Sequence, residues 1–107
     1  MKEIKQGNLA ARITIQKNAV VSSELLRKPT GTITLFAFDQ GQGLSEHSAP
    51  FDALVQILEG EMKITIAAQS FRLACGEYII MPAHDPHALE ALTPAKTLVT
   101  MVKTNEV

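Results

Sequence analysis

Apolar and polar residues alternate along most of the chain with the two-residue period of a β-strand. Residues 62–66 place two isoleucines and a methionine on one side, and a lysine and a threonine on the other. This arrangement is typical of a strand with one buried face. Comparable short runs, rich in β-branched residues, predict further strands at residues 12–15, 32–38, 53–58, 77–81 and 97–102.

Turn-forming residues separate these runs. Glycine or proline occurs between them at residues 28–31, 41–43, 59–61, 75–76 and 93–94. Short strands with turn signals at roughly ten-residue spacing indicate an all-β fold, either an antiparallel sandwich or a barrel. Residues 20–27 are the one segment whose composition suits a helix, but eight residues are too few to decide.

Two of the predicted strands are apolar on both faces. In residues 35–38 and 53–58, apolar side chains occupy odd and even positions alike. One face can fill a barrel, so the other needs a cover, either a second sheet or a second subunit. We therefore expect a homodimer. Residues 12–15 are the strand most easily lent to the partner, because terminal strands can be exchanged at little topological cost.

Length and charge restrict the class of protein. With 107 residues the chain suits a single domain, residues 1–107, with one core. Ten basic residues balance eleven acidic ones, so no basic surface is expected for nucleic acid or an anionic membrane. The first ten residues lack the apolar stretch of a signal peptide, which favours a cytoplasmic protein. Cys75 is the one cysteine, and no base neighbours it in sequence, so we interpret it as structural.

Two stretches of the chain have the spacing of a known double motif. The first, GQGLSEHSAPFDALVQILEG, begins at Gly41, and the second, GEYIIMPAHDPHALEA, begins at Gly76. This arrangement resembles the cupin superfamily, which implies an all-β fold, a cupin-type antiparallel jelly-roll β-barrel. The family pattern G-x5-H-x-H-x3-E-x6-G falls on Gly41, His47, Ala49, Ala53 and Gly60. The second pattern, G-x5-P-x-G-x2-H-x3-N, falls on Gly76, Pro82, His84, His87 and Ala91.

Two of the four departures from these patterns remove metal ligands. In metal-binding cupins, two histidines and a glutamate of the first motif and one histidine of the second hold Fe, Zn, Mn, Ni or Cu. Here Ala49 and Ala53 replace one histidine and the glutamate. His47 and His87 remain, fewer donors than the three or four of a tight site. His84, at the family's glycine position, is a candidate third metal ligand.

The same replacements predict a cavity. Two small side chains should widen the barrel interior unless Phe51, Met62 or Met81 fills the space. An apolar cavity with convergent histidines is typical of a small-molecule site. We therefore predict a ligand pocket formed by His47, Ala49, Ala53 and His87.

Three functions are compatible with these residues. The first is a small-molecule-binding cupin with a degraded metal site inside the barrel. The second is a cupin enzyme of oxygenase or isomerase type, either metal-dependent with His47, His87 and His84 as ligands, or metal-free. The third is a sensor module that acts with a separate DNA-binding partner, because no helix-turn-helix is encoded here. We favour the first.

Overall fold

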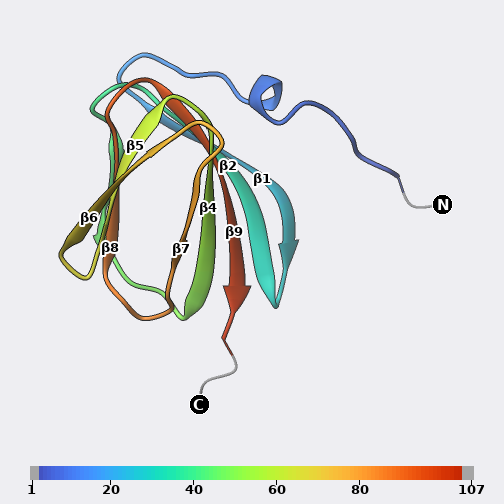
Figure 1. Cartoon of the computed structure of the whole chain (residues 1–107). Coiled ribbons are helices and arrows are strands. Elements are labelled where there is room, and N and C mark those ends of the chain that lie inside the picture. The colour runs from blue at the N-terminus through green and yellow to red at the C-terminus, as the bar shows by residue number, and fades with distance from the viewer. Residues whose placement is uncertain (1–2, 105–107) are drawn as a thin grey trace.

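Two antiparallel β-sheets face each other and enclose the main core (Figure 1). The structure is a computed structural model that describes residues 3–104. One sheet has five strands in the order β1-β2-β9-β4-β7, and the other has four in the order β3-β8-β5-β6. The predicted antiparallel β-barrel is confirmed. The strands are β1 (Val20–Lys28), β2 (Gly31–Phe38), β3 (Gly43–His47), β4 (Phe51–Glu59), β5 (Glu61–Ile66), β6 (Gln69–Ala74), β7 (Tyr78–Met81), β8 (His87–Ala91) and β9 (Ala95–Lys103).

Strand alternation sorts the side chains of the five-stranded sheet onto two faces, as the sequence predicted. On β4, the buried side chains of Ala53, Val55 and Ile57 belong to the core between the sheets. On β2, Phe38 belongs to this core, whereas Leu35 and Ala37 face a second, smaller cluster outside the barrel. The five-stranded sheet is therefore apolar on both faces.

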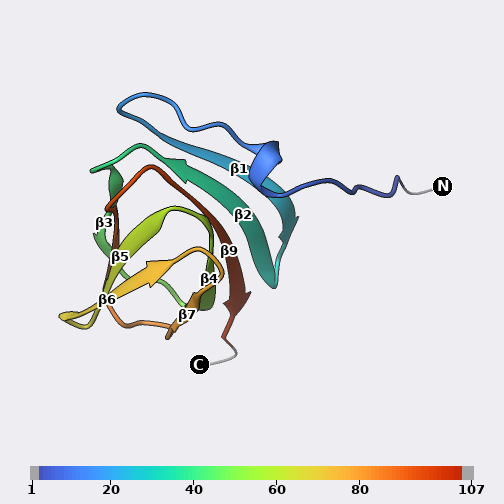
Figure 2. The same cartoon turned by 45° about the horizontal axis from the view of Figure 1, so that its top comes forward.

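The N-terminal segment covers part of the outer face. Ile13 is 5% exposed and packs with Leu35 and Ala37, and Ile15, Leu58 and Leu98 surround them. Figure 2 shows this segment passing over the outer side of β1 and β2 and then continuing away from the body of the protein. The chain itself thus covers part of the outer apolar face, as the sequence required.

One local prediction is wrong, and one undecided segment is now assigned. Residues 12–15 do not form a strand. Arg12 ends a single 3-10 turn, η1 (Ala10–Arg12), and residues 13–15 pack on the sheet without joining it. Residues 20–27 lie in strand β1, because pairing with β2 and burial of alternate apolar side chains outweigh a weak helical preference. Nowhere in residues 3–104 does a helix have the length and apolar character needed to cross a membrane.

The turn between β5 and β6 is strained. Ala67 and Ala68 have φ angles of +48° and +69°, the left-handed region that favours glycine and asparagine. An L-residue in this region costs roughly 1–2 kcal/mol. The N–H of Ala67 donates a hydrogen bond to the carbonyl of Pro86 over 2.9 Å, so the turn also supports the segment that leads into His87.

Candidate ligand-binding site

His47 and His87 face each other across the pair of strands β3 and β8. His47 ends β3, His87 begins β8, and the two are direct cross-strand partners. Between Leu44 and His47 the register shifts, so three steps along β3 match two along β8. Without this shift the alternation that turns Leu44 inward would turn Glu46 inward and His47 outward. The extra residue in β3 therefore brings the two imidazoles together.

Both rings are held by hydrogen bonds to nearby carbonyl groups. His47 Nδ1 lies 2.7 Å from the carbonyl oxygen of Ser45, and His87 Nδ1 lies 3.2 Å from that of Asp85. The two Nε2 atoms are 3.1 Å apart, closer than the ring centroids at 4.3 Å, and the ring planes are inclined by 70°. The rings therefore lean together at their Nε2 ends.

The two histidines differ in their contact with water. His87 is 7% exposed, whereas His47 lies at the exposed end of its strand. Burial lowers the pKa of His87 below the ordinary histidine value, repulsion from His47 lowers it further, and the hydrogen bond to Asp85 opposes both effects. His87 is therefore neutral at pH 7.

A cavity of about 150 Å³ opens beside the histidine pair. Apart from the two imidazoles and one threonine, its walls are apolar. Among the described residues, the lining side chains are Thr34, Phe36, Leu44, His47, Met81, His87, Leu89, Val99 and Met101. The lining includes no lysine, arginine, aspartate or glutamate, so the imidazoles are its main polar feature.

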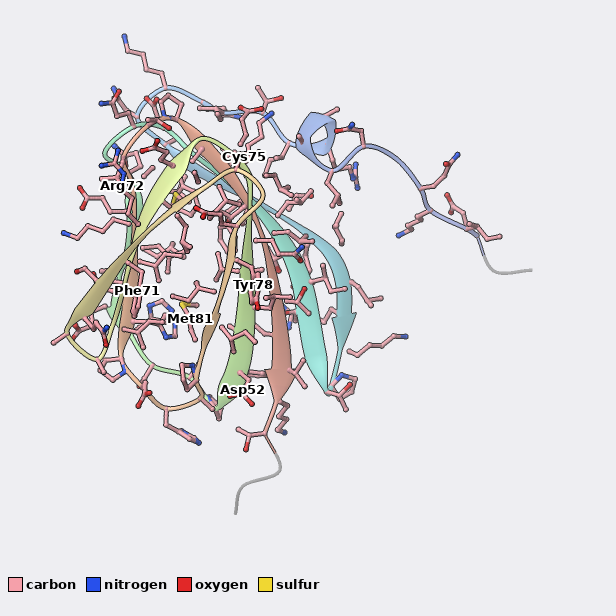
Figure 3. All side chains as sticks on the ribbon, in the orientation of Figure 1. Asp52, Phe71, Arg72, Cys75, Tyr78 and Met81 are labelled. Carbon is pink, nitrogen blue, oxygen red and sulfur yellow. The ribbon has the colours of Figure 1, made fainter. Side chains whose placement is uncertain are left out.

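The two alanines predicted for the pocket do not line this cavity. Ala53 is buried on β4, directly opposite Met81 of β7 and Met101 of β9. Both methionines contribute to the cavity wall, and Figure 3 shows Met81 inside the barrel. Ala49 lies beyond the end of β3, where its carbonyl accepts a hydrogen bond from His84. Methionine side chains thus occupy part of the space that the sequence predicted to be open.

His84 does not join the other two histidines. It is an exposed turn residue with a φ of +71°, which explains the glycine in the family pattern, and its N–H donates to Ala49 over 2.8 Å. Glu46 is exposed on β3. Asp52 accepts a hydrogen bond from the N–H of Ala83, so it stabilises the turn that contains Ala83 and His84.

These positions do not fit a resident transition metal. In residues 3–104, no three side chains of histidine, cysteine, aspartate or glutamate gather into a group that could hold an ion. Two neutral imidazoles without a third protein donor fall short of the ligand sets that such ions require.

Sequence reasoning missed most of the cavity wall. Phe36, Leu44, Leu89 and Val99 each occupy an inward position of their strand, but so do many core residues that do not reach the cavity. The second motif gives a signal for Leu89, which lies two residues after His87 on the same face. Met101 could have been predicted only from its pairing with Ala53 on the neighbouring strand, and the sequence does not specify that pairing.

Comparison with known proteins gives one family. Residues 34–102 match the model described as the cupin domain. A conserved protein of unknown function from Streptococcus pyogenes is 36% identical, with 99% of this chain and 93% of that chain covered and a TM-score of 0.91. A cupin superfamily protein from Desulfitobacterium hafniense is 30% identical over 97% and 95%, with a TM-score of 0.89.

A cupin 2 conserved barrel domain protein from Leptotrichia buccalis is 40% identical, with a TM-score of 0.88. The alignment covers 91% of this chain but 47% of that one. No curated protein matches the chain.

Proposed function

Since the chain belongs to the cupin family, we propose that it binds a small molecule in the cavity beside His47 and His87, at a degraded metal site. The observation that supports this most is the composition of the wall, an apolar pocket with two convergent imidazoles as its polar feature. Pockets of this composition bind a ligand by its apolar body and orient it by a few polar contacts.

The cavity volume limits the size of the ligand. A cavity of about 150 Å³ is comparable with the engineered apolar cavity of ~150 Å³ that accepts benzene. The ligand is therefore a compact molecule with roughly six to eight non-hydrogen atoms inside the barrel, given that a benzene ring already fills such a space. A larger ligand would extend past the exposed His47 into water.

Toluene is a suitable first probe. In protein labelled with ¹³C at the methionine methyl groups, we expect toluene to shift the resonances of Met81 and Met101, which line the cavity. Met62 is an internal control, because it is fully buried in the core but outside the lining. The expected dissociation constant is on the order of 1 mM, as suits a ligand of this size.

A filled cavity provides the matched control. Leu44→Phe adds bulk to the wall at a partly exposed position, so the protein should stay folded and lose the toluene-induced shifts. If toluene left Met81 and Met101 unchanged in the wild-type protein, or moved Met62 equally, the proposed binding site would be wrong.

The metal-dependent alternative has a direct test. We propose that His47 and His87 alone hold no transition metal, since two neutral donors give low affinity. Elemental analysis of protein purified without an affinity tag should then give well under one equivalent of Fe, Zn, Mn, Ni or Cu. One equivalent that His47→Ala removes would favour the enzyme. Loss of that equivalent in His84→Ala as well would make His84 the third ligand.

We also propose a homodimer. One row of side chains crosses the outer face of all five strands, and four of its five members are aliphatic. This apolar row consists of Ile80, Leu54, Thr100, Ile33 and Leu26, in the order of the strands β7, β4, β9, β2 and β1. Its two ends, Ile80 and Leu26, are 56% and 46% exposed, and neither belongs to the cluster that the N-terminal segment covers.

The N-terminal arm, residues 3–9, supports a second copy as the partner. The arm leaves the body of its own chain (Figure 2), and Ile4 on it is 90% exposed. Between the arm and strand β1, a groove of about 740 Å³ is lined by arm residues together with Glu24 and Leu25. In a symmetric dimer, the second copy can cover the apolar row, and the arm of each copy can lie on the other.

A further inference from the structure

The carbonyl contacts of His47 and His87 fix where their protons lie. A carbonyl oxygen can only accept a hydrogen bond, so Nδ1 of each ring must be the donor to Ser45 or Asp85. In a neutral imidazole the other nitrogen then carries a lone pair and no proton. Both Nε2 atoms are therefore acceptors, and they face each other at 3.1 Å.

Two acceptor Nε2 atoms cannot satisfy each other, and at 3.1 Å no third heavy atom fits between them, so each needs a donor that approaches from the side. Within the chain, none of the other cavity-lining side chains in the described residues carries an N–H, and the one hydroxyl is that of Thr34. No hydrogen bond links Thr34 to either ring in the part of the chain that the structure describes. His87 is the buried member of the pair, and a buried acceptor that lacks a donor is costly, so the site favours a ligand that brings a donor to it.

The apolar wall restricts the charge of that ligand. A carboxylate or phosphate offers only acceptors, and no lysine or arginine lines the cavity to balance its charge. An ammonium group would be a donor, but no carboxylate lines the cavity to compensate its loss of water. A neutral hydroxyl group avoids both penalties. Its one proton can be donated to either Nε2 or shared by both in a three-centre hydrogen bond.

The remaining wall favours an aromatic body. Phe36, whose ring stacks on Phe38, contributes to the wall, and Met81 and Met101 bring two thioether groups to the same cavity. Sulfur atoms and aromatic rings attract each other beyond simple burial. The volume of about 150 Å³ matches a single ring.

We propose that the ligand is a neutral hydroxyl compound of the phenol class, whose hydroxyl group hydrogen-bonds to the Nε2 atoms of His47 and His87 and whose ring lies among Phe36, Met81 and Met101. This inference rests on the proposed function, since it names the class of molecule for the same cavity. It adds that the histidine pair recognises a donor rather than an anion.

Phenol and toluene form a matched pair of probes, because phenol carries a hydroxyl group where toluene carries a methyl group of similar size. Their affinities are measured at about pH 8, above the ordinary histidine pKa, by the methionine methyl titration. The reference is the double variant His47→Ala/His87→Leu, which removes both Nε2 atoms and keeps an apolar side chain at the buried position. We expect the phenol-to-toluene affinity ratio to be about tenfold higher in the wild-type protein, the usual contribution of one hydrogen bond.

Imidazole ¹⁵N spectra give a second readout that survives poor folding of the double variant. In wild-type protein, phenol should shift the Nε2 resonances of both histidines, and toluene should leave them unchanged. Equal ratios in the two proteins, or unmoved Nε2 resonances with phenol bound, would overturn the hydroxyl assignment while leaving the cavity as a binding site. Tighter binding of benzoate than of phenol would overturn it in favour of an anion. Failure of toluene and phenol alike to bind would overturn the proposed function as well.

Discussion

Gly60→Ala should remove most of the stability of the protein, with an expected loss of at least about 4 kcal/mol in the free energy of unfolding. Gly60 has a φ of +79°, and a Cβ atom there would lie 2.2 Å from the carbonyl oxygen of Pro94. That oxygen is part of the backbone, so no change of rotamer relieves the contact. The two turns also share hydrogen bonds, because Leu92 N–H donates to the Glu61 carbonyl and Glu61 N–H donates to Thr93 Oγ1.

Gly76→Ala is the matched control. Gly76 has nearly the same backbone conformation, with a φ of +89°, but no atom lies within 4 Å of the position a Cβ would take. The change should cost roughly 1–2 kcal/mol from the left-handed backbone alone. Urea denaturation followed by circular dichroism measures both values. Equal losses in the two variants would show that packing between the turns at Gly60 and Pro94 is unimportant.

Ile80→Glu is expected to convert the proposed dimer into monomers. A charge at the end of the apolar row would be buried twice in a symmetric interface, once from each copy. We expect the dissociation constant of the dimer to rise at least ~100-fold, which corresponds to a loss of roughly 2.7 kcal/mol in the free energy of association. Light scattering at micromolar concentration should give twice 11.6 kDa for the wild-type protein and 11.6 kDa for the variant.

Ser70→Glu places the same charge on the outer face of the four-stranded sheet and should leave the mass unchanged. Both positions are exposed in the single chain, so neither substitution should disturb folding. A wild-type protein that stays at 11.6 kDa would contradict the dimer. A dimer that persists in Ile80→Glu and dissociates on removal of residues 1–9 would move the contact from the apolar row to the N-terminal arm.

The barrel was predictable because its signals are local. Alternation along residues 53–58 and 62–66 requires strands, and the two motifs fix the glycines of the turns. One segment was predicted wrongly and another was left undecided, and at both the local pattern and the tertiary context disagree. Strand β1 contains Glu24, Leu25 and Leu26, residues without a strong strand preference, and its pairing with β2 decides the outcome. Residues 12–15 have the composition of a strand. They lie on the outer face of the sheet, where no edge strand is available for backbone pairing, so they do not form one.

The histidine pair was predictable in kind but not in detail. The spacing of the motifs brought His47 and His87 into one hypothesis, and the structure places their Nε2 atoms 3.1 Å apart. The direction of each Nδ1 depends on carbonyls two residues earlier in the chain, and a sequence does not show where a carbonyl points. The role of Met101 likewise depends on strand pairing between β4 and β9.

The register shift in β3 also bears on how such a site can change over evolution. The same residues, paired without the extra step, would present the carboxylate of Glu46 to His87 in place of the imidazole of His47. A carboxylate paired with an imidazole has different chemistry from two imidazoles, because it can bind a cation or transfer a proton. Loss of the bulge near Ser45 can therefore exchange one pair for the other while every residue of the strand is kept. In this fold, the pairing register of a strand is a determinant of chemistry in its own right.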